Sequence, residues 1–136
     1  MRVLCLDLGD VRTGVAVSDA IGMTANGVKT IENKDPIPEI KKIIDDYLEE
    51  IGSVVVGLPR MMNGTIGAQG EKVMEFAERL KNEISLPVVL WDERLSTTTA
   101  EKALIESNVS RKKRKGLRDK VAATVILQNY LDSKGR

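Results

Sequence analysis

Histidine is absent from this 136-residue chain, and its absence excludes several classes of enzyme. There can be no Ser-His-Asp or Cys-His catalysis, and no ordinary zinc site built from histidine and cysteine. Any hydrolytic chemistry must therefore use carboxylates, lysine, or a metal ion held by oxygen ligands. Among these options, phosphate chemistry with Mg²⁺ or Mn²⁺ is the natural candidate.

Cysteine and long apolar runs are also scarce. The single cysteine, Cys5, cannot form an intrachain disulfide, and its apolar surroundings predict a small core residue in a reducing compartment. No run approaches the roughly 20 apolar residues of a membrane helix. The apolar start of the chain meets Asp7 too early for a secretory signal. We therefore expect a cytoplasmic protein with no membrane contact.

Aromatic residues make up only 3% of the chain, which argues against a platform for base stacking. The hydrophobic content of 42% is enough for one core, and no repeat or linker divides the sequence. We expect one domain over residues 1–136. The net charge of +1 is unevenly distributed: residues 111–120 carry seven Lys/Arg against one Asp, a local charge of +6. A block this dense favours contact with a polyanion.

Hydrophobic periodicity predicts an α/β fold. The expected strands are 2–8, 14–19, 27–32, 53–57 and 87–91; the expected helices are 37–51, 73–84, 98–107 and 119–132, with a loop at 58–70. Short connections between the first three strands predict an antiparallel meander. The later alternation of strand and helix requires parallel crossovers. The prediction is a mixed sheet with helices on both faces.

Acidic residues fall where such a sheet gathers its functional groups, at the carboxyl ends of the strands. Asp7 ends the first strand, the pair Asp92-Glu93 ends the last, and Asp119 opens the final helix. Converging there, three carboxylates would offer hard-oxygen ligands to one or two divalent ions. We favour Glu93 as the ligand from the pair because its longer arm reaches back, with Asp92 as the alternative.

Each acid also has an ordinary structural explanation. Asp7 could bond its own turn, Glu93 could pair with Arg94, and Asp119 could be a plain helix N-cap. Only their joint placement favours a catalytic and metal-binding role.

Several residues are candidates for binding phosphate. Arg12 lies between Gly9 and Gly14 in the first turn, and Arg60 and Asn63 lie in the loop at 58–70. A tight hairpin and an ordinary glycine-rich connection explain these segments equally well. The remaining nucleic-acid-binding candidates are Arg94, Arg111, Lys112, Lys113 and Arg114. With few aromatics, recognition should depend on backbone and shape.

Four segments resemble the YqgF (RuvX-like) family in order and spacing. They are DLGDVRTGVAVSD (7–19), VVVGLPRMMNGTIGAQG (54–70), DERLST (92–97) and RDKVAATVILQNYL (118–131). The resemblance implies a ribonuclease-H-like fold related to the RuvC junction resolvases, and a bacterial protein linked to maturation of the 16S ribosomal RNA 5′ end. By motif, Asp7, Glu93 and Asp119 match the family's acidic positions.

The chain departs from its relatives at two places. Val11-Arg12-Thr13 stands where the family often has Lys-Arg-Ile, which removes one basic contact near the first turn. Compared with the resolvases, the fourth strand ends in Gly57-Leu58-Pro59 instead of an acid, so the second carboxylate must come from the fifth strand. This departure puts a two-metal geometry in question but keeps the requirement for a divalent metal.

The sequence thus predicts an endonuclease that hydrolyses phosphodiester bonds in precursor ribosomal RNA, with branched DNA as the alternative substrate. Resolution of a junction would require a homodimer, whereas RNA processing is compatible with a monomer. A sugar-kinase-like ATPase shares the first Asp-x-Gly turn but needs a second lobe, for which 136 residues leave no room. A non-catalytic RNA-binding module on the same fold is the third hypothesis.

Overall fold

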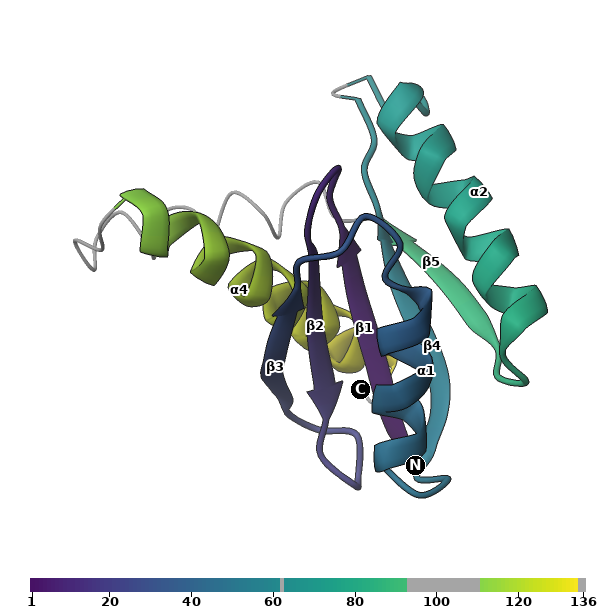
Figure 1. The fold of residues 1–136 in the computed structure, drawn as a ribbon. Helices are drawn as coiled ribbons and strands as arrows, with labels where there is room; N and C mark the ends of the chain where they lie inside the picture. Colours follow the sequence, from purple (N-terminus) through teal and green to yellow (C-terminus); the bar gives the residue numbers. More distant parts are fainter. Residues whose placement is uncertain (62, 93–110, 135–136) are drawn as a thin grey trace.

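The computed structural model describes the backbone of residues 1–61, 63–92 and 111–134, and the side chains of all of these except 111–120. Five strands form one sheet in the order β3-β2-β1-β4-β5. The strands are β1 (Arg2–Leu8), β2 (Thr13–Ser18), β3 (Ala25–Ile31), β4 (Ile51–Leu58) and β5 (Val88–Asp92). The helices in the described ranges are α1 (Ile37–Asp46), α2 (Ala68–Glu83) and α4 (Arg111–Lys134) (Figure 1).

The sheet has the mixed topology that the sequence predicts. Strands β1, β2 and β3 form an antiparallel meander, and β4 and β5 extend it in parallel beside β1. The carboxyl ends of β1, β4 and β5 therefore share one edge of the sheet, the upper edge in Figure 1. This common edge is what can bring together residues that are far apart in the sequence.

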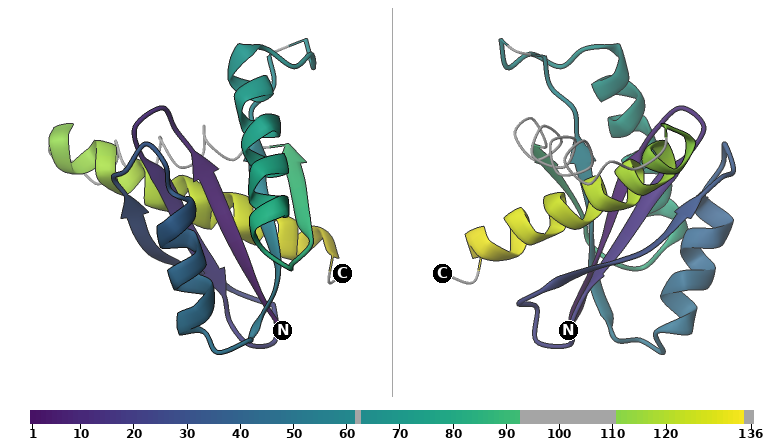
Figure 2. Two further views of the ribbon diagram at one scale, coloured as in Figure 1. Left: turned by 45° about the vertical axis from the view of Figure 1, so that its right-hand side comes forward. Right: turned by 90° about the vertical axis from the view of Figure 1, so that its left-hand side faces the viewer.

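Alternation along the strands separates two hydrophobic layers. In β1, Leu4 and Leu6 pack with α1 and α2 on one face, whereas Cys5 packs with α4 on the other. Figure 2 shows α4 on the opposite side of the sheet from α1. Helices on both faces confirm the predicted layer arrangement.

Small side chains lie where α4 crosses the centre of the sheet. Cys5, Ala16 and Ala123 are all fully buried in the layer beneath the helix. Because none of them is bulky, the helix backbone can approach the strands closely. The predicted core role of Cys5 is confirmed. The predicted inward positions Val121 and Val125 are only half-buried, because the buried stripe instead includes Ala123 and Leu127.

Helix α4 begins at Arg111, eight residues before the predicted start. The prediction that the helix opens at Asp119, with this residue as a possible N-cap, is therefore wrong. Lys, Arg and Leu are good helix formers, and their combined propensity outweighs the single glycine of the segment, Gly116. The predicted helix at 98–107 lies outside the described residues.

Helix α1 ends at Asp46, about one turn before the predicted end. Leu48 and Glu49 adopt left-handed backbone conformations, with φ of 48° and 69°, and these terminate the helical pattern. Ile51, which the periodicity assigns to the helix, is instead a buried residue of β4. The loop expected at 58–70 is also shorter than predicted, because Leu58 belongs to β4 and α2 begins at Ala68.

None of the helices in the described ranges combines the length and the apolar composition that a membrane-spanning segment requires.

Candidate active site at the carboxyl edge of the sheet

Asp7 is a half-buried residue near the carboxyl end of the central strand β1. By alternation it shares the α4 face of the sheet with Val3 and Cys5. Its carboxylate therefore belongs to the layer between the sheet and α4, at the edge where β1, β4 and β5 end. The predicted position of Asp7 at this edge is confirmed.

Glycines occupy the strand positions on both sides of Asp7. In the antiparallel register Asp7 pairs with Gly14 of β2. On the other side, Leu6 pairs with Val56 of β4, and Gly57 follows Val56. Neither neighbouring strand therefore contributes a side chain next to the Asp7 carboxylate on the α4 face.

The end of β5 supplies a tryptophan and an aspartate to opposite faces. Val89 and Trp91 belong to the α4 layer, whereas Val88 and Leu90 belong to the α1–α2 layer. Asp92 lies two residues after Leu90 and so faces the same side of the sheet. It pairs in register with Leu58, a core residue of the α1–α2 layer. Asp92 therefore faces away from the layer that contains Asp7.

Arg60 is an ionic partner of Asp92. Its Nε lies 3.8 Å from Asp92 Oδ2, and a terminal guanidinium nitrogen donates to the Gly64 carbonyl at 3.1 Å. The two contacts tie the loop after β4 to the end of β5. Among the predicted phosphate-binding residues, Arg60 thus has a structural role that the sequence did not indicate.

Trp91 carries a buried polar atom at this edge. Its ring meets Tyr130 of α4 edge-on, with 5.3 Å between ring centroids. The indole N–H is buried and has no acceptor among the residues that the structure describes. A buried donor without an acceptor is costly, so the edge retains one hydrogen-bonding group for a further partner. The sequence suggested only a packing role for this tryptophan.

The other predicted phosphate-binding residues of the first half of the chain have local partners. Arg12 donates to Glu32 at 3.0 Å, and Gly9 N–H donates to the Arg12 carbonyl at 2.8 Å, which closes a tight hairpin. Asn63 Oδ1 accepts from the backbone and side chain of Thr65. The hairpin explanation of the first turn and the local explanation of Asn63 both fit these contacts.

A cavity of about 270 Å³ beside the first turn contains cations that the sequence reasoning missed. Lys34, Lys72 and Arg79 line it together with Gly9 and Asp10. Lys72 lies 3.9 Å from Asp10, and both side chains are mostly exposed. Lys72 and Arg79 are seven residues apart on α2, a spacing that places both on one helix face and could have indicated the patch.

The remaining predicted site residues are incompletely described. Asp119 lies within α4, where only its backbone is described, and the same holds for Arg111, Lys112, Lys113 and Arg114. Glu93 and Arg94 lie outside the described residues. Within the described ranges, no three acidic or cysteine side chains gather closely enough to hold a metal ion. Asp7 nevertheless has the donor chemistry that suits a cation with oxygen ligands.

Comparisons with known proteins identify the family and the fold. The RuvX family model, described as "Holliday junction resolvase", matches residues 1–133. A protein of Clostridium novyi named "Putative pre-16S rRNA nuclease" is 54% identical over 136 residues, covering 98% of this chain and 99% of the relative. A protein of the same name from Thermoanaerobacter pseudethanolicus is 53% identical over 138 residues, covering 98% of both chains.

Solved structures show the fold at greater distance. Thermus thermophilus RuvC superimposes with a TM-score of 0.53 at 14% identity, covering 99% of this chain and 96% of RuvC. The same protein in complex with a Holliday junction gives a TM-score of 0.52 with the same coverage. The ribonuclease-H-like fold and the family that the four motifs indicated are confirmed. The chain therefore belongs to the RuvX family, a family of nucleases that shares its fold with RuvC.

Proposed function

We propose that this protein is a metal-dependent endonuclease that processes the 5′ end of precursor 16S ribosomal RNA, with Asp7, Glu93 and Asp119 as its catalytic metal ligands. The observation that carries the proposal is the position of Asp7 on the α4 face, with glycine on both neighbouring strands. The edge of the sheet thus carries a carboxylate, the type of ligand that Mg²⁺ or Mn²⁺ prefers, on the face that α4 covers.

The orientation of Asp92 supports Glu93 as the second ligand. Like Leu90, Asp92 points to the α1–α2 face, and its Oδ2 lies 3.8 Å from Arg60 Nε. Strand alternation assigns the next residue along the chain to the opposite face, which is the face of Asp7. The orientation of Asp92 therefore favours Glu93 as the ligand from this pair.

The spacing of α4 supports Asp119 as the third ligand. Asp119 precedes Ala123 by four residues and Ile126 by seven, and both of these side chains are fully buried against the sheet. Residues at this spacing share one face of a helix. This spacing supports a position for Asp119 on the helix face that is turned toward the sheet.

Each group would then have a defined task. The three carboxylates would hold Mg²⁺ or Mn²⁺, which when bound would supply an activated water and charge stabilisation for phosphodiester hydrolysis. The chain has no histidine, so it contains no side chain that ordinarily titrates near neutral pH to act as a base. Arg94 and the basic start of α4 would bind the phosphates that flank the cleaved bond.

The choice of substrate follows the names of the relatives. Proteins more than half identical over nearly the full chain are named for the pre-16S rRNA, whereas the junction-bound neighbour is only 14% identical. The scarcity of aromatic residues favours recognition of a folded backbone over stacking on unpaired bases. Branched DNA is the alternative because the family model carries the description of a junction resolvase. Either substrate is cytoplasmic in bacteria.

A parallel cleavage assay tests the proposal. Wild-type protein and the variants Asp7→Asn and Asp10→Asn are incubated with a precursor 16S fragment and with a four-way DNA junction, in Mg²⁺, Mn²⁺ or a chelator. Asp10 is the matched control, since it is three residues away, exposed and weakly paired with Lys72. We expect Asp7→Asn to lose roughly 100-fold or more in rate, because even the outer partners of metal ligands change activity by 10–100-fold.

Three results would contradict the proposal. Full cleavage by Asp7→Asn would remove Asp7 from the mechanism. Tight RNA binding without cleavage by the purified wild type would identify a non-catalytic ribosome-assembly module. Preferred cutting of the junction by a dimer would identify a resolvase, because symmetric incision of two strands requires two active sites.

A further inference from the structure

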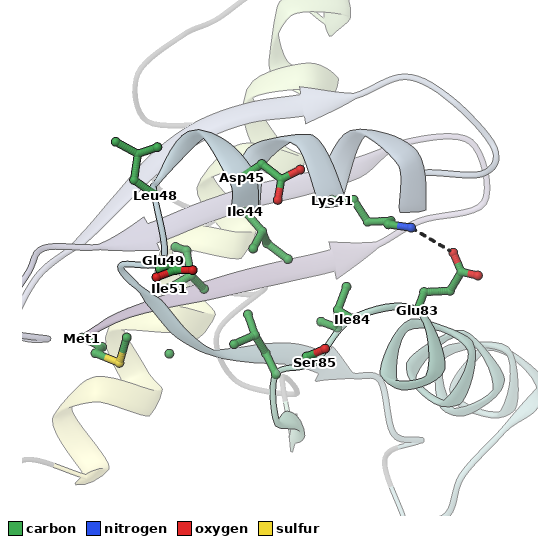
Figure 3. Close-up of a pocket in the computed structure, with 12 residues that line it drawn as sticks. Met1, Lys41, Ile44, Asp45, Leu48, Glu49, Ile51, Glu83, Ile84 and Ser85 are labelled. Atoms are coloured by element: carbon green, nitrogen blue, oxygen red, sulfur yellow. Dashed lines mark ion pairs between the residues drawn. The ribbon is translucent and has the colours of Figure 1, made fainter.

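A groove lies at the end of the sheet opposite Asp7, between the end of α1 and the connection from α2 to β5. We call it the basal groove; its volume is about 830 Å³. Its apolar lining comes from Ile44 of α1, Ile51 of β4, and Ile84 and Leu86 of the α2–β5 connection (Figure 3). The groove is therefore separate from the candidate active site and has an apolar interior of its own.

Two large apolar side chains stand exposed at the rim of the basal groove. Leu48 is 84% exposed and Met1 is 76% exposed. A Cβ added at Gly52 would lie 2.9 Å from Met1 Cβ, so the glycine is what allows Met1 to lie against the strand here. Exposed apolar side chains around an apolar hollow are typical of a surface that binds another molecule.

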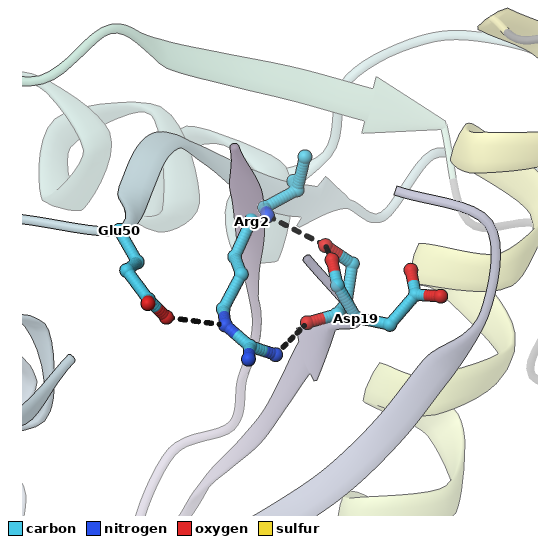
Figure 4. A network of polar contacts seen from close by, with 5 residues as sticks. Arg2, Asp19 and Glu50 are labelled. Atoms are coloured by element: carbon cyan, nitrogen blue, oxygen red, sulfur yellow. Dashed lines mark hydrogen bonds and ion pairs between the residues drawn. The ribbon is translucent and has the colours of Figure 1, made fainter. Parts of the chain in front are cut away.

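The backbone at the rim is held in an unfavourable conformation. Leu48 and Glu49 have φ of 48° and 69°, in the left-handed region that favours glycine. Arg2 holds the residues on either side: its Nε donates to Glu50 at 2.9 Å, and its guanidinium lies 5.4 Å from the centre of the Tyr47 ring. Figure 4 shows the Arg2–Glu50 pair and the further bond from Arg2 toward the end of β2. The fold thus keeps Leu48 projecting outward at a cost in backbone energy.

The charged residues around the basal groove include acidic side chains at a position that does not favour them. The last turn of α1 contains Asp45 and Asp46 and no basic residue, although the negative end of the helix dipole favours cations there. Lys41 is already engaged with Glu83 at 3.7 Å. Asp45 and Glu49 line the groove and form no ion pair with any residue that the structure describes. Against Lys41 and the α-ammonium of Met1, the three carboxylates of Asp45, Glu49 and Glu83 leave the lining of the groove with one net negative charge.

We propose that the basal groove is a docking site for a basic, amphipathic segment of a partner protein. Apolar side chains of the segment would fill the hollow and cover Leu48, while its Lys or Arg side chains would pair with Asp45 and Glu49. Nucleic acid does not fit this surface, because carboxylates repel phosphate. The proposal concerns a protein contact and is independent of the proposed catalytic residues.

A defined peptide tests the proposal. The probe is a fluorescein-labelled helical peptide with leucines at positions i, i+4 and i+7 and lysines elsewhere, and its control has glutamate in place of lysine. Fluorescence anisotropy measures affinity, and amide chemical shifts of labelled protein locate the binding surface. We expect micromolar binding of the basic peptide, shifts at Ile44, Leu48 and Ile84, and no binding of the acidic peptide.

Variants separate this groove from other acidic surfaces. Leu48→Asn removes the apolar rim while suiting the left-handed backbone, and Asp45→Lys reverses the charge while suiting the helix dipole. Each should weaken the basic peptide roughly tenfold or more, as for a hot-spot contact. Two matched controls should bind as the wild type: Ile21→Asn, at an equally exposed apolar residue, and Glu78→Lys, on the exposed face of α2.

Any of three outcomes overturns the proposal: the basic peptide does not bind, its shifts map away from the groove, or its affinity survives both groove variants. A dimer in sedimentation that Leu48→Asn converts to monomer would also overturn it, by assigning the groove to a second copy of the chain. Nuclease activity is not part of this test, so failure of the proposed function would leave its result unchanged.

Discussion

The two neighbouring acidic residues at the end of β5 should have different roles because they point to opposite faces of the sheet. Asp92 and its neighbour are both acidic, yet a strand sends successive side chains to opposite faces. Asp92 is engaged with Arg60 on the α1–α2 face, and the metal site proposed around Asp7 is on the other face. Two substitutions that look alike in the sequence should therefore differ in effect.

We expect Asp92→Asn to retain cleavage within a few-fold of wild type and Glu93→Gln to lose roughly 100-fold, the scale at which changes around a metal site act. Initial rates on the precursor RNA fragment, with Mg²⁺ varied, measure the difference. Exposed ion pairs contribute only about 0–1 kcal/mol, so removal of the ion pair with Arg60 should barely affect folding. Equal losses of rate in both variants would refute the assignment by strand parity.

Asp19 shapes the turn between β2 and β3. Its Oδ1 accepts the Met23 backbone N–H at 2.7 Å and the Thr24 backbone N–H at 3.3 Å. The bond from Met23 is the main reason that the pKa of Asp19 is lowered from its ordinary value. A lowered pKa in the folded state means that the ionised carboxylate stabilises the fold.

The stabilisation by Asp19 should disappear in acid. It is fully present above the unfolded pKa, roughly 3.9, and is lost as the pH falls through the lower folded pKa. Denaturation of wild type, Asp19→Ala and Asp19→Asn at pH 7 and in acid measures this. Asp19→Ala should be less stable than wild type at pH 7, with the gap narrowing in acid. Asp19→Asn keeps a hydrogen-bond acceptor at this position but has no carboxyl group to titrate. If its stability depended on pH as that of the wild type does, Asp19 would not be the source of the pH dependence.

At the scale of whole elements, helices α4 and α1 differ from their predicted bounds for different physical reasons. Helix α4 extends N-terminally to Arg111 because its basic residues favour helix more strongly than one aspartate favours a cap. Helix α1 ends early because Leu48 and Glu49 leave the helical region. In the first case the propensity of the basic residues agrees with the helix, and in the second a turn closed by the bond from Glu50 N–H to the Tyr47 carbonyl ends it.

The stability of the protein should increase when Leu48, which has a strained backbone conformation after α1, is replaced. Leu48→Asn should raise the free energy of unfolding by about 1 kcal/mol, since a left-handed conformation costs most L-residues roughly 1–2 kcal/mol and asparagine less. Thermal and urea denaturation measure the change. Ile21→Asn is the control, because Ile21 is 76% exposed and does not have a positive φ. A decrease in stability at Leu48 equal to that of the control would mean that the strain is not energetically significant.

Charge is unevenly distributed along the chain. Residues 111–120 carry a net +6, so the remainder of the chain sums to −5, and the basal groove lies in this acidic remainder. If the basic start of α4 binds phosphate, the affinity for RNA must fall with salt as counterions are released. The basal groove should contribute nothing to this salt dependence of RNA binding.

We expect replacement of Arg111, Lys112, Lys113 and Arg114 by glutamine to weaken RNA binding and flatten its salt dependence. The slope of log K against log salt should decrease by about 0.7–0.9 for each phosphate that the variant no longer neutralises. Filter binding or anisotropy over a range of KCl concentrations measures the slope. Lys41 and Lys42 changed to glutamine serve as a control on α1, away from the basic segment. An unchanged slope in the quadruple variant would place the phosphate-binding surface elsewhere.

The sequence by itself was enough to determine the class of chemistry and the order of elements. The absence of histidine, the acidic residues at strand ends and the change from period-two to helical patterning are local properties, and they predicted an α/β nuclease with five strands in the correct order of appearance. The four motifs then indicated the family, because together they span nearly the whole chain.

Only the tertiary structure decided which residues face one another. The register of β1 with β2 and β4 put glycines on both sides of Asp7, and the pairing of β5 turned Asp92 away from it. The ion pair of Arg2 with Glu50 joins residues 48 positions apart beside the turn that exposes Leu48. Pairings of this kind come from hydrogen bonds and packing between distant segments, and no local pattern in a sequence records them.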